Sequence, residues 1–404
     1  MTTARPSERS STRRLVAGLA ATQVVSWGVL YYAFSVLLVP MQASLGWSRS
    51  TLVGGFTLAV VVSGLSAGVV GRLLDAEQSR RVMVGGSLLG VGAVVAWSLA
   101  RSVVMYYASF VAVGAAMACV LYEPAFTVLA KRTAPHHRRA ITAVTLVAGL
   151  ASFVFQPLTG LLASHLGWRR ALLVLAGIAA AVSIPIHSLV LPPTERQARP
   201  ARATRSRPSE ASDPRFWALT AAFVGVTTAS MSTGVLLIAY LVDGGWSLSR
   251  AAFAGGTLGA MQLPGRLAFG PLTARVARPL LVGVLFCVPA VGIVVLAVSG
   301  RGWPVWLAVC LLGFGQGTTT LLRATLFVDL FGTTQIGALN GLSGTPITCA
   351  RALAPLGATV LVARTGGYTA GFVALVACSV LAAFVARRVL QHPPERHAET
   401  VATG

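Results

Sequence analysis

The segment PPTERQARPARATRSRPSEASDP, residues 192–214, is the longest polar stretch in a chain that is otherwise strongly apolar. It is basic and rich in proline, which is typical of a connecting segment and not of a packed helix. Apolar runs long enough to cross a bilayer lie on both sides of it, six before and six after. We therefore expect two helical units, residues 1–191 and 215–404, joined by a linker at 192–214.

The composition indicates that these runs lie in a membrane. Hydrophobic residues make up 55% of the 404 residues and charged residues 11%, with a mean hydropathy of +0.75, whereas about one quarter of a soluble domain is charged. A membrane-spanning helix needs about 20 apolar residues, and this predicts an all-α polytopic protein with twelve transmembrane helices. The predicted spans are 15–39, 50–71, 82–100, 103–129, 140–163, 170–191, 215–241, 250–272, 279–299, 303–328, 334–363 and 367–388.

The two halves of the chain repeat each other. Gly46-Trp47-Ser48 precedes the second predicted span, and Gly245-Trp246-Ser247 precedes the eighth, about 199 residues later. Pro157 and Pro355 correspond in the same way. Repeats in one orientation predict two six-helix bundles related by a pseudo-two-fold axis along the membrane normal, with a binding site between them near mid-membrane.

The net charge of +21 has two interpretations. Clustered basic residues are typical of nucleic-acid binding, but here they lie mostly in the loops between spans. With the N-terminus in the cytoplasm, 22 of the 32 Lys and Arg fall on the cytoplasmic side, seven on the other side and three within spans. The positive-inside rule then predicts a multi-pass protein of the cell's inner or plasma membrane, with both termini cytoplasmic, lipid as its surroundings and no nucleic-acid partner.

One loop carries a recognisable motif, GRLLDAEQSRRVMVGG, from Gly71 to Gly86. A carboxylate and arginines at the inner ends of adjacent helices can form charge-assisted bonds that break when two bundles rock; the alternative is that these charges only set topology. The motif resembles the cytoplasmic loop signature of the major facilitator superfamily, with Gln78 in place of the usual second glycine. The resemblance implies a conformational-gate loop containing Gly71, Asp75, Arg80 and Arg81.

Within that superfamily, YAFSVLLVPMQASLGWSRS, residues 32–50, resembles the first helix and its exit in the branch of monocarboxylate transporters and oxalate/formate exchangers. That branch places an arginine on its eighth span, often four residues after an aspartate, to hold a substrate carboxylate and relay a proton. Here Arg266 occupies the arginine position and Gln262 the aspartate position, which puts proton coupling by that residue in doubt. Arg351 occupies the place of a basic residue on the eleventh span of the oxalate exchangers.

The charges inside the predicted spans point to the substrate independently of any family. Arg266, Arg323 and Arg351 lie on spans eight, ten and eleven, although an arginine at a helix centre costs about 2.5–3.5 kcal/mol by insertion scales. This surplus favours an anionic substrate, because a guanidinium binds a carboxylate through two donors. The alternative is structural: one arginine pairs with Glu123, another binds backbone carbonyls, and Arg323 pairs with Asp329.

Glu123, on span four, is the only carboxylate clearly inside a span. It precedes Pro124, which frees the carbonyl four residues earlier and opens the helix. Glu123 is either a proton carrier with a raised pKa or the counter-ion of an arginine. Further residues are predicted to line the substrate cavity, although each could equally be core or interface: Trp27, Tyr31, Tyr122, Gln262 and Gln316.

These observations predict a secondary active transporter that moves a small organic anion, a mono- or dicarboxylate, by alternating access, either in symport with protons or in exchange for another anion. The alternative is an efflux pump for lipophilic compounds or drugs. We expect no enzyme, because no serine, histidine and acid are suitably spaced. His136-His137 lies in a basic loop without acidic or cysteine neighbours, so we expect no metal site there. We also expect no cofactor and a monomeric protein.

Overall fold

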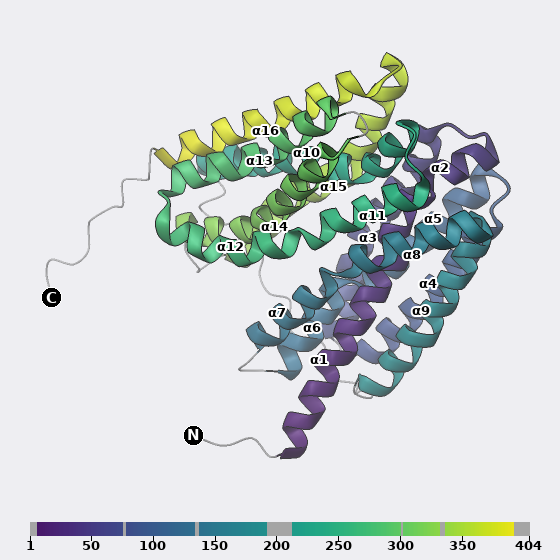
Figure 1. The fold of residues 1–404 in the computed structure, drawn as a ribbon. Helices are drawn as coiled ribbons and strands as arrows, with labels where there is room; N and C mark the ends of the chain where they lie inside the picture. The colour runs from purple at the N-terminus through teal and green to yellow at the C-terminus, as the bar shows by residue number, and fades with distance from the viewer. Residues whose placement is uncertain are drawn as a thin grey trace, which may run out of the picture.

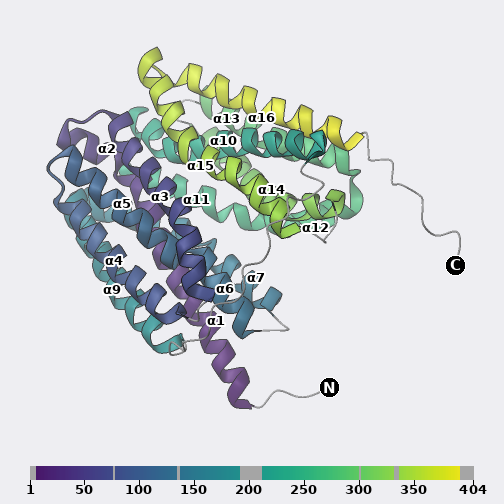
Figure 2. The same ribbon diagram turned by 180° about the vertical axis from the view of Figure 1, so that it is seen from behind.

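The computed structural model describes residues 6–75, 78–133, 137–191, 212–299, 302–331 and 336–391. Every regular element in these residues is helical. The helices form two bundles that meet at one end and diverge towards the other, where α1 begins and α16 ends (Figures 1 and 2). We call the end where they meet the closed end and the opposite one the open end.

The first bundle contains six spans, several of them divided into shorter helices. Its elements are α1 (Pro6–Trp27), a π-helical turn (Gly28–Tyr32), α2 (Ala33–Leu45), α3 (Arg49–Asp75), α4 (Ser79–Leu99), α5 (Val103–Val120), α6 (Tyr122–Arg132), α7 (His137–Ala148), α8 (Ala151–Leu166) and α9 (Trp168–Val190). The second bundle contains α10 (Pro214–Asp243), α11 (Leu248–Ala260), α12 (Gln262–Arg275), α13 (Arg278–Val298), α14 (Pro304–Phe331), α15 (Ile336–Thr365) and α16 (Tyr368–Gln391).

The predicted fold class is confirmed, and each of the twelve predicted spans coincides with one helix or with a consecutive group of helices. Eleven helical stretches in the described residues are long and apolar enough to cross a membrane. The eighth predicted span, 250–272, is not among these eleven; it is divided at Met261 into α11 and α12 and contains the polar residues Gln262 and Arg266. Pro264 has no N–H, so the carbonyl of Ala260 lacks its helical donor at this division.

Span four is also divided, as Pro124 predicts. Helix α5 ends at Val120, and α6 begins at Tyr122. The carbonyl of Val120, four residues before the proline, receives a hydrogen bond from the side-chain amide of Gln23 at 2.7 Å. A backbone group that water cannot reach in the bilayer is thereby satisfied, and the division is a stable feature of the first bundle.

Among the described residues, the most extensive contacts between the bundles are those of α2 with α10, α3 with α15, and α8 with α11. Glycines allow the closest approach. A Cβ atom at Gly259 of α11 would lie 1.6 Å from the hydroxyl oxygen of Ser152 on α8, and one at Gly256 would lie 3.0 Å from Pro157. Small residues at these positions let two backbones pack directly, so the bundles are sealed here and not at the open end.

Candidate functional site

The π-helical turn Gly28–Tyr32 divides span one at the depth of the predicted site. The N–H of Ala33 donates to the carbonyl of Gly28, five residues earlier, which is the π-helical pattern. Gly28 is required because a Cβ atom there would lie 2.1 Å from the ring of Phe155. The wider turn brings two successive tyrosines beside Trp27, with ring centroids 5.2 Å away for Tyr31 and 6.2 Å for Tyr32.

These rings form an aromatic cluster with Tyr122, whose ring centroid lies 4.9 Å from that of Trp27. The indole nitrogen of Trp27 is buried without a hydrogen-bond partner in the described part of the chain. The structure thus brings together three predicted site residues, Trp27, Tyr31 and Tyr122. It also adds Tyr32, which sequence reasoning missed because a four-residue helical spacing selects only Tyr31.

Arg266, near the start of α12, reaches across to the first bundle. One of its terminal nitrogens donates to the carbonyl of Thr145 and the other to the side chain of Gln262, both at 3.4 Å. Gln262 in turn donates to Gln316 at 3.1 Å, and Gln316 donates to the carbonyl of Ser230 at 3.1 Å. The two bonds of Arg266 are long, and its buried Nε has no partner among the described residues. The guanidinium therefore has donors to spare.

Arg351, on α15, is exposed, and its guanidinium donates no hydrogen bond to a described residue. It lies close enough to Tyr31 and Tyr32 to interact with them electrostatically. Arg266 interacts in the same way with Tyr32 and Tyr122. Tyr32 is therefore within electrostatic range of both arginines, one on α12 and one on α15.

Glu123 is exposed in the first turn of α6. Among the described side chains it has no salt bridge within 4.0 Å. It lies within electrostatic range of Arg323 on α14, and Arg323 also interacts electrostatically with Arg351. Glu123 is thus an acidic group within electrostatic range of one basic group of the other bundle, Arg323. The predicted pairing of Arg323 with Asp329 involves a side chain outside the described residues.

The predicted gate loop lies at the open end, between α3 and α4. The side chain of Asp75 lies outside the described residues, so its bonds to Arg80 and Arg81 stay a prediction. Arg80 is half-buried and Arg81 exposed. The ammonium group of Lys131, on α6, donates to the carbonyl of Leu74 at 2.9 Å, which ties span four to the end of span two. A Cβ atom at Gly71 would meet nothing within 4 Å.

Helical spans arranged in two bundles are the architecture that internally repeated membrane transporters share. Residues 19–345 match the family model described as Major Facilitator Superfamily, and the chain belongs to that superfamily. Among curated proteins it is similar to monocarboxylate transporter 13 of Bos taurus, with 26% identity over 365 residues that cover 86% of this chain and 80% of the relative. Monocarboxylate transporter 12-B of Danio rerio is 26% identical over 362 residues, covering 77% and 74%.

Among solved structures, the chain resembles a bacterial homologue of the human lysosomal transporter Spinster. The TM-score is 0.69 for the inward-facing occupied conformation and 0.70 for the inward-facing unoccupied one. Both comparisons cover 96% of this chain, at 14% sequence identity. This likeness supports the fold, and the identified superfamily is one of transporters, so the chain is a transporter and not an enzyme. The resemblance inferred from the loop motif and the first span is thereby confirmed.

Proposed function

We propose that this protein is a secondary active transporter of a small organic anion, a mono- or dicarboxylate, and that Arg266 and Arg351 bind the anion together. The observation that carries the proposal is that Arg266 of α12 and Arg351 of α15 both lie within electrostatic range of Tyr32, and that the buried Nε of Arg266 has no partner among the described residues. The similarity to monocarboxylate transporters supports the same substrate class.

The energetic argument is that cations inside a membrane protein need anionic partners. Placing an arginine inside a membrane span without a counter-charge is costly, and two nearby guanidinium groups also repel each other. A carboxylate that enters between Arg266 and Arg351 relieves both costs, because each guanidinium presents a planar pair of donors that matches two carboxylate oxygens. The hydroxyls of Tyr31, Tyr32 and Tyr122 would supply further donors around the same anion.

We propose that Glu123 couples transport to protons. Gln262 does not titrate, so the branch's usual acidic position cannot carry the proton here. Glu123 lies in a divided helix, faces Arg323 of the other bundle and has no close ion pair among described side chains. A carboxylate that takes up a proton when the anion binds and releases it when the anion leaves would carry the two in the same direction. Exchange of one anion for another is the remaining alternative.

We propose a location in the cell's inner or plasma membrane with both termini in the cytoplasm, which the arginine distribution supports. The open end then faces the cytoplasm and the closed end faces outwards. We further propose that residues 192–214 join two units that rock against each other. The structurally similar transporters were solved in inward-facing conformations, which supports the assignment of the open end to the cytoplasmic side.

The test is a thermal-shift screen of the purified protein against formate, acetate, lactate, oxalate and succinate, since a ligand of the folded state raises its apparent stability. We expect one of these carboxylates to raise the melting temperature. Arg266→Lys and Arg351→Lys should each weaken its binding about tenfold or more, because an ammonium group cannot reproduce the two-donor contact. Arg250→Lys, on the closed end of α11, is the matched control.

The double variant Arg266→Gln/Arg351→Gln completes the design, because two groups that share one ligand give non-additive losses. Unchanged affinity in both single variants for an anion that binds the wild type would overturn the assignment of these arginines. A response to lipophilic cations and none to any carboxylate would instead support the efflux alternative.

A further inference from the structure

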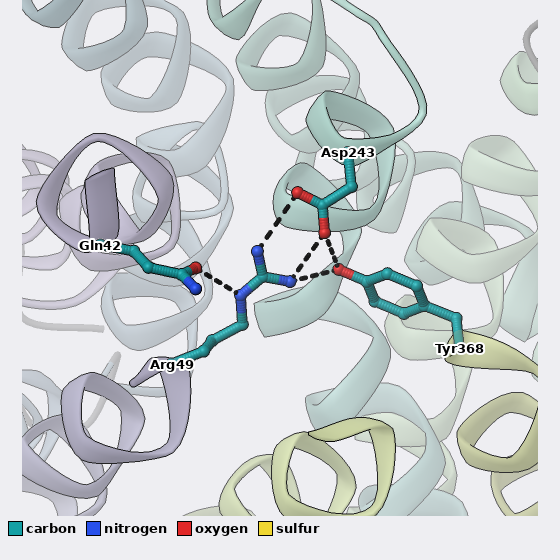
Figure 3. A network of polar contacts seen from close by, with 4 residues as sticks. All are labelled: Gln42, Arg49, Asp243 and Tyr368. Carbon is teal, nitrogen blue, oxygen red and sulfur yellow. Dashed lines mark hydrogen bonds and ion pairs between the residues drawn. The ribbon is translucent and has the colours of Figure 1, made fainter. Parts of the chain in front are cut away.

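At the closed end, one arginine of the first bundle is bound by two residues of the second (Figure 3). Arg49, the first residue of α3, forms a two-pronged salt bridge with Asp243, the last residue of α10, with N–O distances of 2.9 and 3.2 Å. Arg49 also donates to the hydroxyl of Tyr368, at the start of α16, and that hydroxyl donates to Asp243 at 2.7 Å. Gln42, from α2, accepts the remaining bond from Nε at 3.0 Å.

This network is held rigidly on both sides. Gln42 orients the guanidinium from within the first bundle, and Tyr368 packs against Tyr240 and Phe372 of the second, with ring centroids 5.0 and 5.8 Å away. The Arg49 side chain is 15% exposed and the Asp243 side chain 41%. Partial burial and the planar two-donor geometry make such a pair stronger than an ordinary surface salt bridge.

The network is not a by-product of the internal repeat. With the offset of about 199 residues, Arg49 corresponds to Leu248, and Asp243 corresponds to Ser44. The neighbouring Gly-Trp-Ser motifs do repeat, so the loop shape is shared by both halves, whereas the ion pair is specific to one crossing. A charge that merely set topology would not need a partner on the opposite bundle.

We propose that Arg49, Asp243, Tyr368 and Gln42 form a latch that holds the closed end shut and sets how often it opens. The proposal rests on the alternating-access function proposed above, because that mechanism requires the bundles to separate at this end. The bonds of Arg49 to Asp243 and to Tyr368 join the two bundles and are lost on separation, whereas the Gln42–Arg49 and Tyr368–Asp243 bonds each lie within one bundle. A contact present in only one conformation shifts the equilibrium towards that conformation.

The test measures opening without a substrate. Thr57, eight residues beyond Arg49 on α3, is buried and donates to the carbonyl of Ala352 on α15 at 2.9 Å. A cysteine placed at Thr57, in a chain whose five native cysteines are replaced, reacts with a membrane-impermeant maleimide only when the closed end opens. The reagent is applied to intact cells and, separately, to inverted membrane vesicles.

We expect Arg49→Gln and Asp243→Asn each to raise the labelling rate from outside about three- to tenfold, and the charge-exchanged pair Arg49→Asp/Asp243→Arg to lower it again. Tyr368→Phe keeps the aromatic packing, removes the hydroxyl and should give a smaller increase; it keeps the test informative if a charge variant folds poorly. Arg250→Gln is the matched control, since Arg250 stacks on Trp246 within its own bundle, 4.0 Å from the ring.

Unchanged labelling in Arg49→Gln, Asp243→Asn and Tyr368→Phe, with normal expression and elution of the variants, would overturn the latch. The outcome is independent of substrate identity, because the assay contains no carboxylate. If the variants label faster but no carboxylate raises the melting temperature, the latch stands and the anion proposal falls. If a carboxylate binds but the labelling rate is unchanged in the variants, the anion proposal stands and the latch falls.

Discussion

Gly28→Ala is expected to disturb the site without touching any polar group. Gly28 begins the π-helical turn, and a Cβ atom there would lie 2.1 Å from the Cγ atom of Phe155. Ordinary van der Waals contact begins at 3.4 Å, so the turn and α8 must separate by about 1.3 Å. Phe155 is buried, with 4% of its surface exposed, and its neighbours leave the ring little room to move.

The magnitude follows from this distance. Overpacking of a tightly packed interior costs about 1–3 kcal/mol, and we expect a loss of stability in that range. The larger effect should be on binding, because a displacement of about 1 Å takes the hydroxyls of Tyr31 and Tyr32 out of the 2.5–3.0 Å range of a hydrogen bond between oxygens. We expect carboxylate affinity to fall about tenfold, which corresponds to about 1.4 kcal/mol.

The assay compares apparent melting temperatures in detergent with and without the carboxylate identified in the screen. Gly92→Ala, on α4, is the matched control: a Cβ atom there meets nothing within 4 Å, so the variant should behave as the wild type or be slightly more stable. Phe155→Leu in the Gly28→Ala background should recover part of the loss, because the smaller side chain makes room. Wild-type stability and affinity in Gly28→Ala alone would refute the reasoning.

Two further variants test other parts of the site. Glu123→Gln should fold normally and keep anion exchange but lose accumulation driven by a pH gradient, measured in proteoliposomes; unchanged accumulation would exclude the proton role. Gln23→Leu leaves the Val120 carbonyl without its side-chain donor and should lower stability by about 1–3 kcal/mol, read as a reduced melting temperature. Gln391→Leu, at the exposed end of α16, is its control, and equal melting temperatures for the two would contradict the capping role.

The twelve spans could be predicted because the bilayer leaves few choices. A segment that crosses hydrocarbon must satisfy its own backbone, so a long apolar run is sufficient evidence for a helix. The divisions of spans four and eight depend on one residue each, Pro124 and Pro264, and only the first was anticipated. The helical stretch that contains the first predicted span, 15–39, extends beyond it on both sides, from Pro6 to Leu45.

The missed residues depend on contacts between distant parts of the chain. Tyr32 joins the cluster only because Gly28 meets Phe155 and the helix widens there, and no local pattern encodes that meeting. Arg49 and Asp243 are 194 residues apart and lie at span ends, where the sequence alone suggests only a charge that sets topology. Their pairing depends on how the two bundles dock, which periodicity within each bundle does not reveal.

The interruptions of the helices explain why the site lies where it does. In α6 and in α12 the proline is the third residue of the new helix, a first-turn position that tolerates the missing N–H. Tyr122 and Glu123 are the first two residues after one division. Gln262 is the first residue after the other, and Arg266 lies one turn further along α12. A divided span is tolerated in a membrane only where its freed backbone groups meet protein or water. Proline beside a charge within an apolar span therefore indicates, from sequence, where a polar pathway crosses the bilayer.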